Sequence, residues 1–332
     1  MKIHHRERPD RWTGRLLCVT HTERPVEVER CSLNFLTRRY ADPARLRAVV
    51  PFEQLTPSSQ HSPYGGGITV WSFADDDWRR PELLAHLEPE GYKPQHALWH
   101  RGRLWVLGVE CLEVYDARLE RLAVVEDPWL AGAHTIAPDG WGRLLLSCSA
   151  SDAVLMVDED SLNVVAAVRL PEALYGHNYS LKRSDSVVRH YVANELQLTH
   201  INCAWPYQRG VLISTLIQGA IGWFGPEDDY RELARGFVGC HGVRVSEAGE
   251  IYFSDSCQGT VVFLDGRHRI ARRVAFDSRW LHDALQLAGP VWAVSPAERN
   301  RIILFDLDRC EPIRTIDCTP FGASTQFLSL SR

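Results

Sequence analysis

The hydrophobic positions of this chain fall in short runs that repeat along the sequence. Residues 142–158 and 249–265 align without a gap, and each holds a short apolar strand, a turn of small residues and a second apolar strand. Residues 102–116, 210–225 and 289–306 have the same pattern. One short strand precedes each segment and a more polar strand usually follows it. Each unit therefore has four strands in about 40 residues, which predicts a β-propeller blade.

The two ends of the chain indicate how the ring of blades closes. Residues 324–331 (STQFLSLS) look like a first strand with nothing after it, whereas residues 14–20, 67–73 and 81–87 look like the missing three. Joining them gives one composite blade and avoids open edge strands. We therefore predict an all-β, six-bladed β-propeller, in a single domain, with the N- and C-terminal strands closing one blade.

The blades cover most of the chain, and two long insertions interrupt them. Both insertions are expected on the face where the innermost strands begin, as loops over a concave site. The predicted bounds are residues 14–90 plus 324–332 for the composite blade, 94–126, 133–171, 198–236, 240–277 and 281–317 for the other five, and 21–66 and 171–198 for the insertions.

Composition and charge exclude several classes of protein. The 332 residues include 37 basic and 42 acidic side chains, a balance that argues against a nucleic-acid or anionic-membrane partner. No apolar run approaches the roughly 18 residues that span a bilayer, and the charged start does not resemble a secretory signal. Cys18, Cys148, Cys203 and Cys318 lie in apolar runs, as expected of buried thiols in a reducing cytoplasm. We expect a cytoplasmic protein with a small-molecule substrate, and the sequence leaves its oligomeric state open.

Histidine recurs in the first strand of five blades, and first strands line the central channel of a propeller. Each of these histidines stands six to ten residues before the glycine that opens the second strand. The composite blade instead offers Ser324, Thr325 and Gln326 at this level. The five histidines are His96, His134, His200, His241 and His282.

Imidazoles that point inward at one height would meet near the axis. They would repel one another if protonated, and each ring nitrogen needs a partner. A divalent transition metal meets both needs, so we predict that three or four of the five bind one ion and leave positions for water or substrate. An all-histidine site favours Fe(II), Zn, Cu, Ni or Mn over Ca or Mg. The alternative is that duplication has copied a structural histidine that hydrogen-bonds the backbone of a neighbouring blade.

Three further side chains are candidates for a carboxylate or general base beside this site. Asp255 ends a second strand, Asp283 directly follows His282, and His21 lies in the composite blade. The sequence has no GxSxG, HExxH or P-loop motif, which removes common hydrolase, zincin and nucleotide-binding interpretations. We predict a metal-dependent enzyme for a small molecule, either a Lewis-acid lyase or hydrolase or an oxygenase. The alternative is a non-enzymatic propeller that binds a peptide or protein on its top face.

The repeats also resemble those of known propellers. GEIYFSDSCQGTVVFLD (249–265) and GRLLLSCSASDAVLMVD (142–158) are similar to blades of the NHL-repeat and senescence-marker-protein/gluconolactonase-like families. This resemblance implies the six-bladed fold, and a fold does not fix a function. The gluconolactonase-like group implies a Glu, Asn and Asp set around one ion, which we do not place in this sequence. A histidine-lined axis is closer to the zinc centre of the peptidyl-hydroxyglycine lyases and to the Fe(II) centre of the seven-bladed carotenoid cleavage oxygenases.

Overall fold

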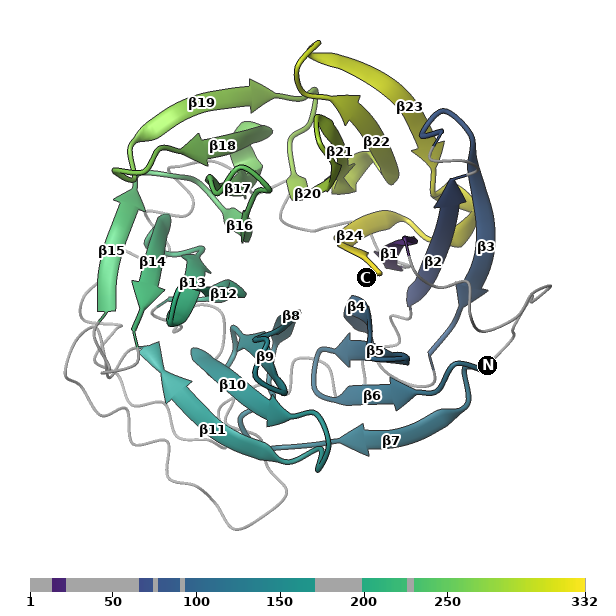
Figure 1. Ribbon diagram of the computed structural model, residues 1–332, viewed down its shortest axis with the longest axis vertical. Coiled ribbons are helices and arrows are strands. Elements are labelled where there is room, and N and C mark those ends of the chain that lie inside the picture. Colours follow the sequence, from purple (N-terminus) through teal and green to yellow (C-terminus); the bar gives the residue numbers. More distant parts are fainter. Residues whose placement is uncertain are drawn as a thin grey trace.

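The computed structural model describes residues 14–21, 66–73, 77–89, 93–170, 199–225 and 230–331. These residues form six four-stranded antiparallel sheets around a central axis, as the blades of a β-propeller (Figure 1). The predicted all-β, six-bladed fold is therefore confirmed. The two long insertions lie outside the described residues, except for His21 and Gly66, the two ends of the first one. No helix in the described ranges is long and apolar enough to cross a membrane.

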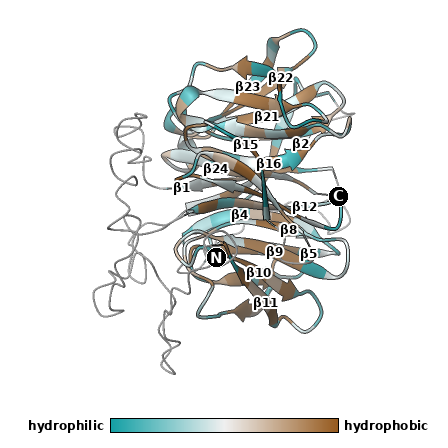
Figure 2. Ribbon diagram, turned by 90° about the vertical axis from the view of Figure 1, so that its left-hand side faces the viewer, coloured by the Kyte–Doolittle hydropathy of each residue, from teal (hydrophilic) through white to brown (hydrophobic). Residues whose placement is uncertain are grey.

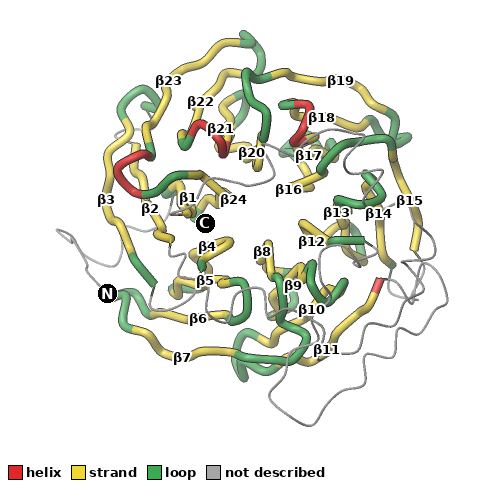
Figure 3. The backbone as a smooth tube through the Cα atoms, turned by 180° about the vertical axis from the view of Figure 1, so that it is seen from behind, coloured by secondary structure: helices red, strands yellow, loops and turns green. Residues whose placement is uncertain are grey.

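The composite blade is built from both ends of the chain. From the axis outwards it consists of β24 (Ser324–Leu330), β1 (Leu16–His21), β2 (Gly66–Phe73) and β3 (Pro81–Leu87). Strand β24 pairs antiparallel with β1, so that Leu330 lies opposite Leu16 and Ser324 lies opposite His21. Figure 3 shows the two strands side by side from behind. This pairing confirms the predicted closure of the ring.

Each of the other five blades is one continuous stretch of chain, numbered here as blades 1 to 5. Blades 1 and 2 consist of β4 (Pro94–His100), β5 (Arg103–Gly108), β6 (Leu112–Tyr115) and β7 (Arg121–Val125), and of β8 (Ala133–Pro138), β9 (Arg143–Cys148), β10 (Ala153–Asp158) and β11 (Val164–Arg169). Blade 3 consists of β12 (Ile201–Tyr207), β13 (Gly210–Thr215), β14 (Ala220–Phe224) and β15 (Tyr230–Arg235). Blades 4 and 5 consist of β16 (Cys240–Val245), β17 (Ile251–Asp255), β18 (Thr260–Leu264) and β19 (Ile270–Ala275), and of β20 (Leu281–Ala288), β21 (Val291–Pro296), β22 (Arg301–Asp306) and β23 (Glu311–Asp317).

Burial falls from the axis to the rim, which explains the hydrophobic pattern of the sequence. Inner and middle strands such as β4 and β5 are buried along nearly their whole length, whereas outer strands such as β7 and β19 are mostly exposed. A strand covered on both faces is expected to be continuously apolar. Figure 2 shows hydrophobic segments along the strands of the blades. The more polar strand that usually follows the two apolar strands of a repeat is therefore the outer strand of the blade.

The hydrophobic core is divided among the gaps between blades. Six apolar clusters each join two neighbouring blades. One of them, for example, packs Leu107 and Leu112 of blade 1 against Leu146 and Leu155 of blade 2. Because the apolar side chains are used between the blades, the inner strands present polar side chains to the axis, and these make the candidate site.

Candidate functional site

The candidate site lies at the mouth of the axis, which we define as the end where the inner strands begin. Three of the predicted histidines occupy one equivalent position there. His134, His241 and His282 each follow the first residue of an inner strand that pairs with the second strand. Gln95 and Asn202 take this position in blades 1 and 3.

The other predicted histidines are displaced from this position. His96 lies one residue further into β4 than Gln95, and His200 lies directly before β12. The expectation that five histidines share nearly the same point therefore holds for three of them. His21, predicted as a candidate base, ends β1 at the same mouth, where its Nε2 lies 2.6 Å from the Pro94 carbonyl oxygen.

A phenylalanine side chain lies among the histidines that surround the axis. Phe327 of β24 is fully buried, and its ring centroid lies 4.5 Å from that of His282, 5.6 Å from His96, 6.2 Å from His241 and 6.5 Å from His134. These four partners come from four different blades. Phe327 was not predicted from the sequence, in which Ser324, Thr325 and Gln326 were expected at this level of the composite blade.

Those three polar residues are engaged with the protein itself. The Gln326 amide donates to the Ser324 hydroxyl over 3.0 Å, and the Thr325 hydroxyl donates to the Arg301 carbonyl over 3.3 Å. The composite blade therefore contributes an aromatic ring, rather than a polar group, to the middle of the mouth.

Two of the histidines have a fixed tautomer. His134 Nδ1 lies 2.8 Å from the Gly132 carbonyl oxygen, and His241 Nδ1 lies 2.8 Å from that of Gly239. A carbonyl oxygen can only accept, so in both rings Nδ1 carries the proton and the neutral Nε2 keeps a lone pair. A backbone carbonyl on one nitrogen is the usual support for an imidazole that binds a metal or accepts a proton through the other.

His96 differs because both of its ring nitrogens are used within the protein. Its Nδ1 accepts the backbone N–H of Ile136 over 3.1 Å, and its Nε2 donates to the Leu328 carbonyl over 3.2 Å. These contacts join blade 1 to blade 2 and to the C-terminal strand. At this position the structure has the backbone-bonded histidine of the alternative interpretation.

His200 and His282 have a nitrogen that lacks such support. The Nδ1 atoms of both are buried and have no hydrogen-bond partner in the described part of the chain. A buried nitrogen without a partner costs stability, so these two atoms are places where a bound ligand would be favourable. Asn202, at the equivalent position of blade 3, donates to the Cys240 carbonyl over 2.9 Å, and its side-chain oxygen likewise has no described partner.

The histidines of the mouth are held in the neutral form. Burial lowers the pKa of His134 to about 4 and that of His241 to about 3. Burial also lowers the pKa values of His21, His200 and His282 well below the ordinary value, and the repulsion of neighbouring imidazoles adds to the effect. Neutral imidazole is the form that can ligate a metal or accept a proton.

The structure places the two candidate carboxylates in ion pairs. Asp255 accepts the Val238 backbone N–H over 2.7 Å and lies 3.2 Å from an Arg273 nitrogen of the outer strand. Burial raises the pKa of Asp255. Asp283 is buried against Arg244, with N–O distances of 2.5 and 2.8 Å. Both carboxylates therefore have partners that stabilise them within the blades.

Arg244 is the buried group that the sequence analysis missed. Its guanidinium also donates to the carbonyl oxygens of Ala284 and Leu328, 2.7 and 3.0 Å away, and lies 5.5 Å from the Trp205 ring centroid. Burial alone would lower the pKa of Arg244, but the Asp283 carboxylate raises it above its ordinary value. The available signal was a single charged residue inside the apolar strand CHGVRV.

The donors at the mouth form pairs rather than one larger cluster. Among the residues that the structure describes, no three His, Cys, Asp or Glu side chains are gathered so as to hold one metal ion together. The nearest imidazoles are His134 with His200, and His241 with His282, with centroid separations of 5.4 and 4.7 Å.

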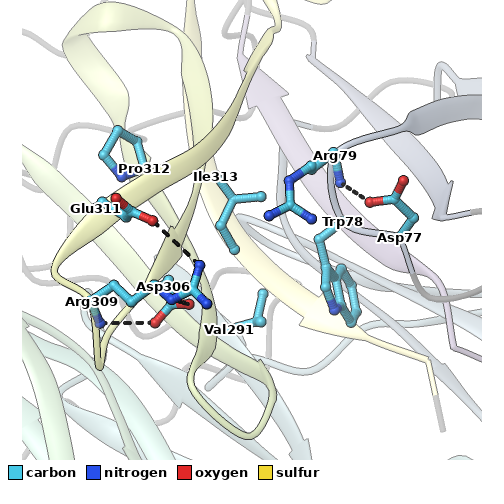
Figure 4. A pocket seen from close by; sticks show the side chains of 9 residues that line it. All are labelled: Asp77, Trp78, Arg79, Val291, Asp306, Arg309, Glu311, Pro312 and Ile313. Atoms are coloured by element: carbon cyan, nitrogen blue, oxygen red, sulfur yellow. Dashed lines mark hydrogen bonds and ion pairs between the residues drawn. The ribbon is translucent and has the colours of Figure 1, made fainter.

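A cavity of about 390 Å³ lies away from the histidines, between the composite blade and blade 5 (Figure 4). Trp78 and Ile313 form part of its wall, and its acidic side chains lie near basic groups. Asp306 and Glu311 lie 3.8 and 3.7 Å from Arg309 nitrogens. This cavity is a hollow of the rim whose acidic side chains lie near basic ones, whereas the buried imidazoles gather at the axial mouth.

Comparisons of sequence find no relative for this chain: no family model matches it, and no curated protein matches it. Solved structures are similar in shape. A chain of a nidogen–laminin complex has a TM-score of 0.62 at 9% identity, over 96% of this chain and 99% of that one. The similarity shows the propeller fold. It agrees with the fold-level resemblance seen in the repeats.

Two lyase structures are similar as well. A streptogramin B lyase has a TM-score of 0.54 at 9% identity, over 79% of this chain and 90% of its own. Virginiamycin B lyase from Staphylococcus aureus, as a catalytically inactive variant with one histidine replaced by alanine and with quinupristin, has a TM-score of 0.53 at 10% identity, over 80% and 83% of the two chains. At these identities the likeness again concerns the fold.

Proposed function

We propose that this chain is an enzyme that acts on a small molecule at the mouth of the propeller axis. The observation that carries the proposal is the set of neutral imidazoles there, of which His134 and His241 have one nitrogen held by a backbone carbonyl and the other left with a lone pair. Such nitrogens are suited to ligating a metal or accepting a proton. A purely structural histidine uses both nitrogens internally, as His96 does.

We further propose that the reaction depends on a divalent transition metal. The donor chemistry fits such an ion, because the imidazoles are neutral and two of them are fixed in the tautomer that leaves Nε2 open. The candidate ligands are His134, His200, His241 and His282, which lie in two pairs, so that an ion would be held by the two members of a pair, while His96 stays a structural group. Fe(II), Zn, Cu, Ni and Mn all suit nitrogen ligands. When bound, the ion would supply Lewis-acid or oxygen chemistry.

His21 is the group that we assign as the general base. Its Nε2 faces the Pro94 carbonyl, so this nitrogen carries the proton and Nδ1 keeps the lone pair. Its lowered pKa keeps it neutral at physiological pH. Asp255 and Asp283 are weaker choices for this role, because each carboxylate is already paired with an arginine.

We favour lyase or hydrolase chemistry over oxygenase chemistry. The support is that propellers of similar fold include lyases, one of which is described as inactive after replacement of a histidine. The non-enzymatic alternative, a propeller that binds a peptide or protein partner, is supported by the similar fold of a chain from the nidogen–laminin complex.

Metal analysis tests these possibilities. Protein purified without a histidine tag is analysed for bound elements before and after loading with Zn, Fe(II), Cu, Ni or Mn. Bound Zn supports the Lewis-acid reaction, whereas bound Fe or Cu redirects the proposal to oxygen chemistry. A folded protein that takes up none of these ions under any loading condition contradicts the metal-dependent function. For variants of the mouth histidines, His268→Asn is the matched control. His268 lies in the turn between β18 and β19 and has a φ of +59° that Asn tolerates.

A further inference from the structure

The histidines of the mouth fall into two pairs of similar construction. The first histidine pair is His134 of blade 2 with His200, which precedes the inner strand of blade 3. The second histidine pair is His241 of blade 4 with His282 of blade 5. In each pair the rings come from neighbouring blades, with centroid separations of 5.4 Å in the first and 4.7 Å in the second.

The two pairs also share their hydrogen bonding. One member of each pair, His134 or His241, donates from Nδ1 to the carbonyl of the glycine two residues earlier. These glycines, Gly132 and Gly239, have φ values of +61° and +80°, a conformation that side chains other than glycine rarely adopt. The same G-x-H segment therefore builds the same fixed imidazole in blades 2 and 4.

The other member of each pair has a buried ring nitrogen without a described hydrogen-bond partner. The Nδ1 atoms of His200 and His282 have no hydrogen-bond partner in the described part of the chain. Each pair thus combines one imidazole whose free nitrogen is defined with one imidazole whose Nδ1 lacks a described partner. This combination points to a ligand that accepts lone pairs from both rings.

Phe327 contacts members of both pairs. Its ring centroid lies 4.5 Å from that of His282, 6.2 Å from that of His241 and 6.5 Å from that of His134. The backbone of the next residue holds strand β24 in place: the Leu328 N–H donates to Asp283 over 2.8 Å and its carbonyl accepts from Arg244 over 3.0 Å. The aromatic ring is therefore fixed beside three of the four paired imidazoles.

The spacing within each pair suits a shared ion. Metal–nitrogen bonds of about 2.0–2.1 Å place each ring centroid roughly 3.2 Å from the ion, so two imidazoles bound at angles between about 90° and 115° have centroids about 4.5–5.4 Å apart. We propose that each histidine pair is a separate two-histidine site for a divalent transition metal, so that the mouth takes two ions. This inference rests on the proposed metal-dependent function and refines its stoichiometry.

The chemistry of the surroundings restricts the ion. The nearest candidate carboxylates, Asp255 and Asp283, are bound to Arg273 and Arg244. Two nitrogens and no carboxylate favour Zn, Ni, Cu or Co over Mg and Ca, which need oxygen ligands. The remaining coordination positions of each ion would be open to water or substrate.

Zn²⁺ titration followed by isothermal calorimetry and equilibrium dialysis tests the stoichiometry. We expect two equivalents for the unmodified chain, one for His134→Gln, one for His282→Gln and none for the double variant. His268→Asn is expected to keep both. Circular dichroism confirms that each variant is folded, and the unmodified chain alone already distinguishes one equivalent from two.

Two results would overturn the inference, and they differ in what else they remove. One equivalent that is lost in either single variant means a single site that uses both pairs, and the proposed metalloenzyme stands. No zinc binding by the folded, unmodified chain removes the paired zinc sites, and the metal dependence falls with them only if Fe(II), Cu, Ni and Mn are not bound either. Retention of two equivalents in the folded double variant places the zinc elsewhere and overturns the assignment to these histidines.

Discussion

Arg244 and Asp283 form a buried, two-point ion pair that fastens the C-terminal strand to the rest of the ring. The guanidinium nitrogens lie 2.5 and 2.8 Å from the two carboxylate oxygens. Both residues also bind Leu328, the arginine at the carbonyl and the aspartate at the backbone N–H. One residue of blade 4 and one of blade 5 therefore bind the same residue of the composite blade, directly beside Phe327.

Removing one partner of this ion pair should destabilise the fold strongly. Arg244→Met leaves the Asp283 carboxylate buried without its charge partner, and such losses typically cost about 3–5 kcal/mol. The free energy of unfolding from urea titration measures the effect. The double variant Arg244→Met/Asp283→Leu should be more stable than Arg244→Met, because no charge is then left unpaired. As a control, Arg269→Ala removes an exposed ion pair and should cost at most about 1 kcal/mol. Equal stability of the Arg244→Met variant and the unmodified chain would contradict this account.

Deleting residues 324–332 should open the ring. The deletion removes β24, so β1 loses its inner neighbour and the mouth loses Phe327. An exposed inner edge is an unpaired strand that favours aggregation. We expect a lower melting temperature and concentration-dependent light scattering. An unchanged melting temperature would mean that the closing strand contributes little to the fold.

Mildly acidic pH should destabilise the folded chain. Six axial histidines have pKa values lowered by burial, and those of His96 and His241 fall to about 3. These rings bind protons only after unfolding, so their full contribution to stability is present above the unfolded pKa of about 6.5 and is lost as the pH falls towards the folded values. Each such histidine lowers the stability by about 1.4 kcal/mol per pH unit in that window.

Urea midpoints at pH 7, 6 and 5 measure this dependence. Stability should fall continuously over the series, and His96→Gln should make the fall less steep because it removes one of the titrating groups. A stability that stays constant from pH 7 to pH 5 would show that the histidines are not held neutral by the fold.

Replacement of His96 separates its structural role from the roles of the paired histidines. His96→Gln can keep both hydrogen bonds, because an amide donates to the Leu328 carbonyl and accepts from the Ile136 N–H. His96→Ala leaves the Ile136 N–H buried without a partner, at about 1–3 kcal/mol, and removes one of the two donors to the Leu328 carbonyl, which keeps its hydrogen bond from Arg244. Urea denaturation should therefore rank the glutamine variant well above the alanine variant, with metal content unchanged in both. Loss of metal from the folded glutamine variant would make His96 a ligand after all.

The fold was largely predictable because each blade of a propeller repeats the same pattern of strands. Apolar pairs of strands returned at a constant period, and STQFLSLS lacked the partners that residues 14–20 and 67–73 could provide. Five of the six histidines at the mouth were found through the same repetition, and His21 through its position beside the second strand.

The details of the mouth were less predictable, because they depend on register. Irregular pairing at the start of each inner strand shifts side chains by one residue, and a shift of one residue redirects a side chain to the other face. His96 and His200 are therefore displaced from the position that His134 occupies in its own blade. Phe327 was missed since a lone aromatic in an apolar strand is indistinguishable from a core residue.

The composite blade also determines when the mouth can form during synthesis of the chain. Strand β24 is synthesised after every other strand described here, yet it supplies the ring at the centre of the histidines and the backbone that Arg244 and Asp283 hold. A growing chain can form blades 1 to 5 early, since each is one contiguous stretch whose strands meet locally. The proposed site is complete only after the last strand has joined. A chain that ends before β24 would therefore carry the histidines of the other blades without Phe327 beside them.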